Sequence, residues 1–320
     1  MREFLKNFDY LKRLKFIGGF LIALTVLTYL ANIHRYFEMI NSFAVYYFYL
    51  LLLLAIPFFI KKQWIWGTAF LLFSFLNLSK FAYLYFSPDQ ASVSNTEKLL
   101  ILNLFTANKE HQKVIKLIKE EQADHICLVE VNDRWEFEIR KSLNKEYPHV
   151  IAKPRSDNFG ILFMSKKPFK GEIIYVDGIP VIKAIYPEKT IVSVHPLPPI
   201  SKNYFQKRNE FLAEIKNWNL SDKNLIVCGD FNAVPWSPFF KKMLKENNLK
   251  LASQGFGINT SWPTNIPFLR IPIDHCLVSQ NGSIKSYKIG PNVGSDHFPI
   301  VAEFGFTQDQ ETTENTKTTE

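Results

Sequence analysis

A long apolar region near the start of this chain constrains its fold more than any other feature. Residues Phe16–Phe86 carry almost no charge and are rich in Leu, Phe, Ile and Tyr. Helices that are apolar on all sides, joined by short loops, would leave much apolar surface exposed in a soluble bundle. From Ser87 onward, charged residues recur as they do in an ordinary soluble protein. The sequence therefore predicts a membrane segment followed by a soluble domain.

Three stretches inside this region are each close to the length of a membrane span. They are Phe16–Ile33, Phe43–Ile60 and Trp64–Phe86. About 20 apolar residues are needed to cross the hydrocarbon core of a bilayer as a helix. The first stretch does not resemble a cleaved signal peptide, because its apolar part is too long and two further stretches follow it. We therefore expect residues 16–86 to form an anchor of three transmembrane helices.

The positions of the basic residues favour one orientation of this anchor. Five Lys and Arg residues lie within residues 1–15, and Lys61 and Lys62 lie between the second and third stretches. Because Lys and Arg gather on the cytoplasmic side of membrane spans, the net charge of +8 indicates topology more than nucleic-acid binding. We expect residues 1–15 in the cytoplasm and everything after Phe86 on the opposite side of the membrane.

Composition divides the remainder into a linker, a domain and a tail. Residues 87–97 are polar and predict a linker that keeps the domain close to the bilayer. Residues 307–320 hold only polar side chains and predict a disordered tail. Between them, residues 98–306 predict one domain of strands with a few helices, which fits two packed sheets flanked by helices. The helical patterns lie at Val114–Glu121, Phe205–Trp218 and Phe239–Lys245.

Polar residues follow six short apolar runs of this domain. Apolar runs of this length predict buried strands, and a polar residue at the end of each lies where a core gives way to a cleft. Carboxylates, carboxamides and imidazoles brought to one rim would make a divalent-metal phosphohydrolase site. The residues are Asn103, Glu130, His195, Asp230 with Asn232, Asp274, and Asp296 with His297.

Two of these clusters have structural alternatives. Asp230 and Asn232 alternate in an extended segment and so point to the same side, where they could orient a water and a phosphate oxygen. An Asx-turn is the structural alternative for this pair. Glu130 ends an otherwise apolar run, so it needs a partner such as a divalent cation. A salt bridge to Arg134 is the alternative there.

The order of the clusters resembles that of the endonuclease/exonuclease/phosphatase superfamily, the DNase I-like and sphingomyelinase-like metal phosphodiesterases. The resemblance covers Leu99–Phe304 and is most specific at Gly229–Asn232 and Ser295–Pro299. Two segments, Asp230–Ser237 and Ile273–His275, look like the membrane-anchored bacterial branch. That branch includes the teicoplanin-resistance type of protein, which is associated with lipid-linked pyrophosphates of the cell envelope.

The resemblance implies a fold and a metal site. The fold is of the α+β class, a four-layer α/β/β/α sandwich with the site at one end and three transmembrane helices before it. In the family the residue that matches Glu130 binds Mg²⁺ or Mn²⁺, and the residue that matches Asn103 helps to position the metal or its water. The resemblance also assigns Asp296 to the metal.

The resemblance implies catalytic roles for the remaining clusters. His297 pairs with Asp274, Asp230 prepares the attacking water, and Asn232 with His195 stabilises the charge that develops on the phosphate. The sequence does not decide which of them is the base. Asn158 resembles a family residue that lines the cleft. His275 stands where nuclease branches often have tyrosine or arginine. Trp236, Trp262 and Phe268 are candidates for an apolar lip around an acyl or prenyl chain, with core packing as the alternative.

The leading hypothesis is a membrane-anchored Mg²⁺-dependent hydrolase that cleaves a phosphoester or pyrophosphate bond of an envelope lipid. We expect it in the bacterial cytoplasmic (inner) membrane, with the catalytic domain outside the cytoplasm and the bilayer and a phosphorylated lipid as partners. An extracytoplasmic nuclease is the first alternative, although the sequence reveals neither a basic groove nor DNA-inserting loops. A catalytically inactive membrane-bound binding module is the second, and the complete set of site residues argues against it.

Overall fold

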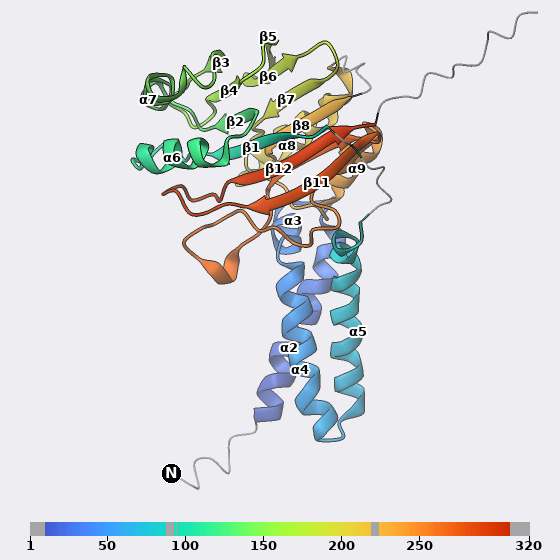
Figure 1. Ribbon diagram of the computed structural model, residues 1–320. Coiled ribbons are helices and arrows are strands. Elements are labelled where there is room, and N and C mark those ends of the chain that lie inside the picture. The colour runs from blue at the N-terminus through green and yellow to red at the C-terminus, as the bar shows by residue number, and fades with distance from the viewer. Residues whose placement is uncertain (1–9, 88–92, 94, 219–223, 308–320) are drawn as a thin grey trace, which may run out of the picture.

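A narrow helical bundle and a wider body of sheets and helices make up this protein (Figure 1). The computed structural model describes residues 10–87, 93, 95–218 and 224–307. The predicted tail after Thr307 and the greater part of the predicted linker lie outside the described residues. Glu97, the last residue of the predicted linker, is the first residue of a strand.

The first sheet has six strands in the order β11-β12-β1-β2-β4-β3. β1 pairs with β12 on one side in antiparallel fashion and with β2 on the other side in parallel fashion. The strands are β1 (Glu97–Asn103), β2 (His125–Val129), β3 (His149–Lys153), β4 (Ile161–Ser165), β11 (Gly282–Ile289) and β12 (Ile300–Phe306).

The second sheet also has six strands, in the order β5-β6-β7-β8-β10-β9. β7 and β8 form its parallel pair, and β10 runs antiparallel to β8. The strands are β5 (Lys170–Val176), β6 (Ile179–Ile185), β7 (Thr190–Val194), β8 (Leu225–Asp230), β9 (Leu249–Leu251) and β10 (Asp274–Ser279).

Strand alternation in β1 shows how the layers form. Leu99 and Ile101 point into the core between the two sheets, whereas Leu100 and Leu102 point into a second core beneath helices. A third core lies on the outer face of the second sheet. The predicted four-layer α/β/β/α sandwich is therefore confirmed. The covering helices are α6 (His111–Glu121) and α7 (Asp133–Leu143) on the first sheet, and α8 (Lys202–Glu214) and α9 (Pro238–Glu246) on the second.

Among the described residues, the N-terminal bundle contains three long α-helices and one short one. Tyr10–Leu30 (α2, Tyr10–Leu27, with the 3₁₀ turn Thr28–Leu30) and Trp64–Tyr85 (α5, Trp64–Phe81, with the 3₁₀ turn Ala82–Tyr85) are each long and apolar enough to cross a membrane. α4 (Ala44–Ile60) meets that criterion only together with α3 (Arg35–Asn41), from which it is bent by 56°. Among the described residues the candidate spans therefore number two, or three if the bent pair counts as one. The chain is already helical at Tyr10, before the predicted Phe16.

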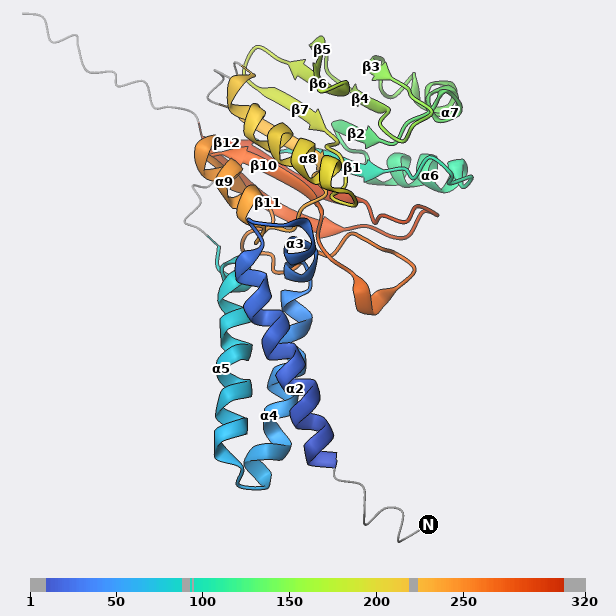
Figure 2. The same ribbon diagram turned by 180° about the vertical axis from the view of Figure 1, so that it is seen from behind.

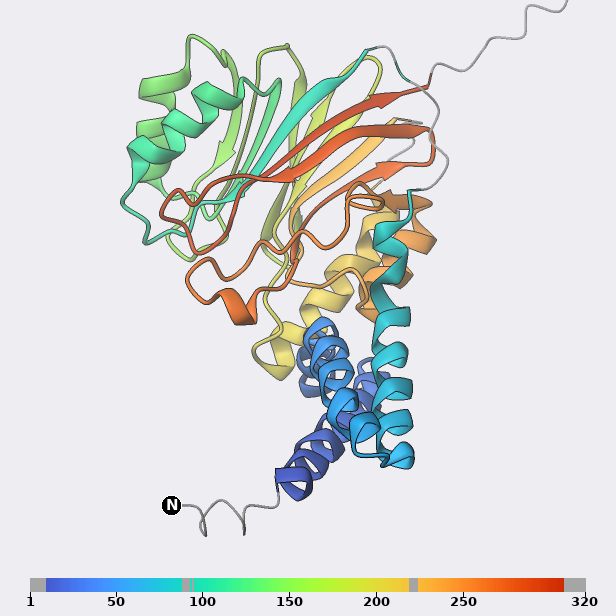
Figure 3. The same cartoon turned by 60° about the horizontal axis from the view of Figure 1, so that its bottom comes forward.

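The bundle packs directly against the sandwich. α3 lies beside α8 and α5 lies beside α9 (Figures 2 and 3). The backbone oxygen of Leu84, just after α5, accepts hydrogen bonds from the backbone N–H groups of Gly255 and Gly257 at 2.8 and 2.9 Å. The Tyr83 hydroxyl donates to the backbone oxygen of Pro235 at 3.1 Å. Side-chain and backbone contacts, and not a linker alone, thus join the two parts.

Candidate active site

Strand ends of both sheets meet at one edge of the sandwich. In the first sheet Asn103 ends β1 opposite Val129, so Glu130 follows β2 at the same level. In the second sheet Asp230 ends β8 directly opposite Asp274, which begins β10. Because the carboxyl ends of parallel strands share one edge of a sheet, the polar residues that follow them are brought together. His195 comes directly after β7, the parallel neighbour of β8.

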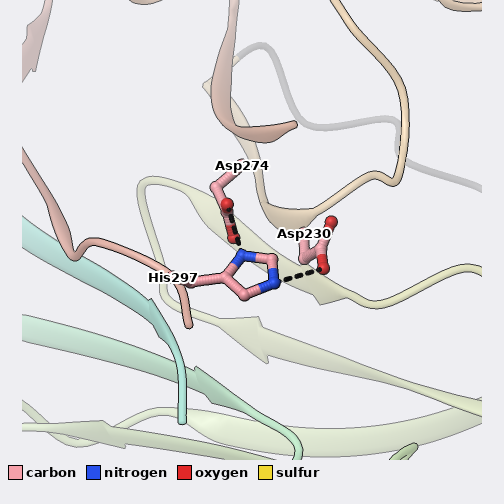
Figure 4. A group of neighbouring side chains, drawn as sticks. All are labelled: Asp230, Asp274 and His297. Carbon is pink, nitrogen blue, oxygen red and sulfur yellow. Dashed lines mark hydrogen bonds and ion pairs between the residues drawn. The ribbon is translucent and has the colours of Figure 1, made fainter. Parts of the chain in front are cut away.

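His297 lies between two aspartates, as Figure 4 shows. Its Nδ1 atom is 2.8 Å from Asp274 Oδ2, and its Nε2 atom is 3.8 Å from Asp230 Oδ2. His195 Nε2 approaches the same Asp230 oxygen at 3.5 Å. All four side chains are buried. A hydrogen-bonded His–Asp pair of this kind fixes the orientation of the imidazole and stabilises its protonated form.

Burial and charge act against each other in this group. Burial alone would lower the pKa of His297, but the charges of Asp274 and Asp230 outweigh it and raise that pKa well above the usual histidine range. Burial alone would raise the pKa of Asp230, but hydrogen bonding by His195 and the charge of His297 lower it overall. Burial dominates at Asp274 and raises its pKa. His297 is thus a cation at neutral pH, and Asp230 is an anion.

Three hydrogen-bond donors face the Glu130 carboxylate at the rim of the cleft, and one of them is the Thr106 hydroxyl, 3.4 Å from Oε2. Asn103 Nδ2 donates to Glu130 Oε1 at 3.0 Å, and the backbone N–H of Thr106 donates to Oε2 at 3.1 Å. Asn103 Nδ2 also donates to Asp230 Oδ2 at 3.2 Å, while its Oδ1 accepts from the backbone N–H of Phe105 at 2.9 Å. Asn103 therefore enters the site as a donor that fixes two carboxylates. Thr106 belongs to no motif or pattern that the sequence predicts as part of a site.

Asn232 is fixed mainly through its backbone. Its N–H donates to Asp230 Oδ1 at 2.8 Å, an Asx-type bond, and its φ of 50° lies in the left-handed region that asparagine tolerates. The side chain donates to the backbone oxygen of Pro196 at 3.0 Å. Gly229, directly before Asp230, packs so closely on β7 that an added Cβ would lie 2.0 Å from the backbone oxygen of Val194. A glycine is required at that point of β8.

One cleft of about 530 Å³ joins most of these residues. Asn158 is exposed and lines it, as predicted for a substrate-facing residue, but the structure gives it no contact that defines a role. Asp296 also lines the cleft and accepts a hydrogen bond on Oδ2 from Trp262 Nε1 at 3.1 Å. The sequence predicts Trp262 only as a candidate for an apolar lip or for core packing, and not as a partner of Asp296. Phe159 packs against His195 with ring centroids 5.3 Å apart.

Several aromatic candidates have other surroundings. His275 is buried between Phe231 and Phe240, and its Nε2 atom is 2.8 Å from the backbone oxygen of Ala233. It supports the fold, and burial lowers its pKa from 6.5 to about 4. Trp236 is buried in the core beneath the second sheet and does not line the cleft, whereas Phe268 is 71% exposed.

The site offers oxygen ligands that suit a hard divalent cation. Asp296 Oδ1 is buried and has no hydrogen-bond partner among the described residues. Glu130 Oε1 accepts one bond, from the amide of Asn103, and a carboxylate oxygen has room for a second partner. Both residues line the same cleft. Oxygen-only sets of this kind favour Mg²⁺ or Mn²⁺.

A second group of possible ligands lies deeper. Asp230, Asp274 and His297 offer ligand atoms that all lie within 4.8 Å of one another. A metal ion bound there would have to displace the proton that the raised pKa of His297 favours. The buried group therefore also fits proton handling and phosphate binding, beside the oxygen atoms that Glu130 and Asp296 present to the cleft.

Comparisons with known proteins agree with this geometry. The model of the Endonuclease/Exonuclease/phosphatase family matches residues 100–297, a range that contains every candidate site residue named above. No curated protein matches the sequence at a significant level.

Solved structures with a similar fold share little sequence with this chain. An endonuclease/exonuclease/phosphatase family protein from Bacteroides thetaiotaomicron superposes with a TM-score of 0.54 at 16% identity, covering 67% of this chain and 99% of that chain. The endonuclease/exonuclease/phosphatase from Bacteroides vulgatus gives 0.53 at 17% identity, covering 67% and 100%. Danio rerio TDP2 complexed with a single-strand DNA product gives 0.53 at 14%, covering 66% and 100%. These likenesses show the fold.

Proposed function

Because this chain belongs to the endonuclease/exonuclease/phosphatase family, we propose that it is a membrane-anchored hydrolase of a phosphoester or pyrophosphate bond in an envelope lipid. Members of the family are metal-dependent phosphoester hydrolases, so the reaction class follows from membership. The observation that carries the proposal is the convergence of Glu130, Asp230 and the His297–Asp274 pair on one cleft beside the bundle.

The site residues divide the chemical work according to charge. Protonated His297 and the donor His195 suit the non-bridging oxygens of a phosphate, whose negative charge grows during hydrolysis. The lowered pKa of Asp230 makes it a weak base, so it is better suited to orient a water than to deprotonate it. Glu130 and Asp296 would hold Mg²⁺ or Mn²⁺. A bound cation would neutralise phosphate charge and favour in-line attack by water.

The bundle supports a membrane location. Its outer surface displays large apolar side chains that a soluble protein would cover, among them Phe16 (79% exposed), Leu53 (61%) and Ile65 (85%). Lys61 and Lys62 form the turn at the end of the bundle away from the sandwich, where the first helix also begins (Figure 1). Basic residues at that end favour the cytoplasm there, and hence an extracytoplasmic sandwich on a bacterial inner membrane.

Phosphate release from undecaprenyl pyrophosphate by the full-length protein in detergent tests this function. We expect release with Mg²⁺, no release with EDTA, and loss of at least a hundredfold in Glu130→Gln, which keeps the side-chain volume but not the charge. Glu138→Gln is the matched control, since Glu138 pairs with Arg134 on α7 and does not line the cleft. Full metal-dependent activity in Glu130→Gln would contradict the assigned site.

The same assay separates the two alternatives. A fold shared with TDP2, a protein solved with a single-strand DNA product, keeps a nuclease as the second candidate. Nicking of plasmid DNA without phosphate release from the lipid would favour it. A protein that binds neither Mg²⁺ nor Mn²⁺ in calorimetry and hydrolyses neither substrate would be a binding module.

A further inference from the structure

The short helix α3 of the bundle is fixed to the active-site side of the sandwich by a buried ion pair. Glu38 of α3 pairs with Arg208 of α8, and both side chains are almost completely buried. Ser237 donates its hydroxyl hydrogen to the other Glu38 oxygen. On the far side, Arg208 Nη1 donates to the backbone oxygen of Asn232 at 2.8 Å. A residue of the anchor is thus two hydrogen-bonded steps from the segment that carries Asn232.

A second set of contacts fixes the end of α3 and the start of α4. Trp236 Nε1 donates to the backbone oxygen of Asn41 at 2.7 Å. The Tyr46 hydroxyl of α4 donates to the backbone oxygen of Arg270, in the loop that runs into β10, at 2.8 Å. The junction between α3 and α4 is therefore held from both sides by loops of the catalytic domain.

This junction is also a wall of the catalytic cleft. Met39, Ser42 and Phe43 line the same cleft as Asp230 and His297. The 56° bend between α3 and α4 falls at Ser42 and Phe43, so the break in the helix lies where the anchor meets the cleft. Much of the remaining apolar lining comes from loops of the sandwich, namely Phe159, Pro198, Pro199, Ile200, Ile271 and Ile273.

The cleft therefore combines the chemistry of two environments. Carboxylates and imidazoles provide a place for a phosphate and its cation, and Met39 and Phe43 provide apolar surface in continuity with the helices of the bundle. A water-soluble phosphoester has no use for an apolar wall supplied by a membrane anchor. An amphiphilic substrate uses such a wall, because exposing its hydrocarbon chain to water costs free energy. The wall keeps the chain covered while the phosphate is hydrolysed.

We propose that the α3–α4 junction is a substrate-binding wall, which covers the first part of the hydrocarbon chain of a lipid phosphate or pyrophosphate while the headgroup occupies the catalytic cleft. The proposal rests on the function proposed above and adds a subsite to it. Met39 and Phe43 contact the chain, and Glu38 and Arg208 position the segment that carries them. The anchor is then part of the active site.

Chain-length selectivity of the full-length protein in detergent tests the wall. The readout is the ratio of kcat/KM for farnesyl pyrophosphate to kcat/KM for dimethylallyl pyrophosphate. We expect this ratio to fall about tenfold in Met39→Gln and in Phe43→Ser, since the longer farnesyl chain covers more of the wall than the dimethylallyl group does and so loses more apolar contact. Phe43→Leu, which stays apolar, should retain most of the selectivity. Leu30→Gln is the matched control, because Leu30 is exposed to a similar extent as Met39 and does not line the cleft.

The outcomes distinguish this inference from the proposed function. If the wild type prefers the longer chain and both Met39→Gln and Phe43→Ser keep that preference, the chain binds elsewhere. The proposed wall would then be wrong, while the proposed lipid function would stand. Equal hydrolysis of both pyrophosphates by the wild type would overturn the wall as well. Hydrolysis of bis(p-nitrophenyl) phosphate without either pyrophosphate would overturn the proposed lipid function and the wall together.

Discussion

Replacing Glu38 by glutamine removes the charge that faces Arg208 and changes the size of the side chain very little. Arg208 is fully buried, so its guanidinium would keep its charge without a counter-ion. Removing one partner of a buried ion pair costs about 3–5 kcal/mol. Glutamine can still accept one hydrogen bond, so we expect a loss near the lower end of that range, about 3 kcal/mol.

The effect should reach the active site because Arg208 also holds the backbone oxygen of Asn232. We expect Glu38→Gln to lower the midpoint of thermal unfolding by several degrees and to lower kcat on any accepted phosphoester substrate. The double variant Glu38→Leu/Arg208→Met should recover part of the stability, because apolar residues of similar volume can replace a buried pair. It should not recover kcat, since the bond to Asn232 is still lost.

Thermal unfolding followed by intrinsic fluorescence, with kcat measured on the same preparations, checks both effects. Glu120→Gln, which breaks an exposed pair with Lys116 on the surface of α6, should leave both values close to wild type. If Glu38→Gln unfolds at the wild-type temperature and keeps the wild-type kcat, the buried pair neither holds the anchor to the sandwich nor positions Asn232.

Three further outcomes follow from the same structure. A fragment that starts at Ser87 lacks Glu38, and it exposes the core residues of the sandwich that Phe81 and Leu84 cover in the full chain. It should therefore aggregate or show a much reduced kcat, and a stable, fully active fragment would contradict this. The pKa of His275, lowered by burial to about 4, contributes about 3 kcal/mol of stability above pH 6.5 that is lost as the pH falls toward 4. Unfolding of His275→Gln between pH 7 and pH 4 should therefore depend less on pH than that of the wild type, and an unchanged dependence would refute the assignment. In intact cells a membrane-impermeant maleimide should label Lys145→Cys but not Lys61→Cys. Background labelling should be low because the three native cysteines are buried. Labelling of Lys61→Cys alone would show the opposite orientation.

Local patterns were sufficient to predict most of the sandwich. The apolar runs that end at Asn103 and Asp230 are buried strands, and α6, α8 and α9 lie where apolar residues recur at helical spacing. α7 was missed, although Trp135, Ile139 and Leu143 recur every four residues and are its buried face. Asn132, whose side chain accepts from the N–H of Trp135 and caps this helix, was a second local signal.

Contacts between distant segments account for what the sequence did not reveal. The pairing of Glu38 with Arg208 spans 170 positions, and neither residue belongs to a motif. The hydrogen bond from Trp262 to Asp296 likewise depends on a loop whose course only the folded chain defines. The linker had suggested a tethered domain, whereas buried contacts fix the domain to the bundle. Apolar patterning reports that a side chain is covered and does not report what covers it.

The order in which the two partners of the buried pair leave the ribosome has a consequence for biosynthesis. Glu38 is made 170 positions before Arg208, which at about 5–20 residues per second is an interval of roughly ten to thirty seconds. The helical hairpin of α4 and α5 has then been synthesised completely, and the later part of the chain folds against it. A nascent copy whose N-terminal helices are misplaced would present no partner to Arg208. With the membrane location proposed above, catalytic competence would be coupled to successful insertion, and hydrolysis would be restricted to correctly delivered copies.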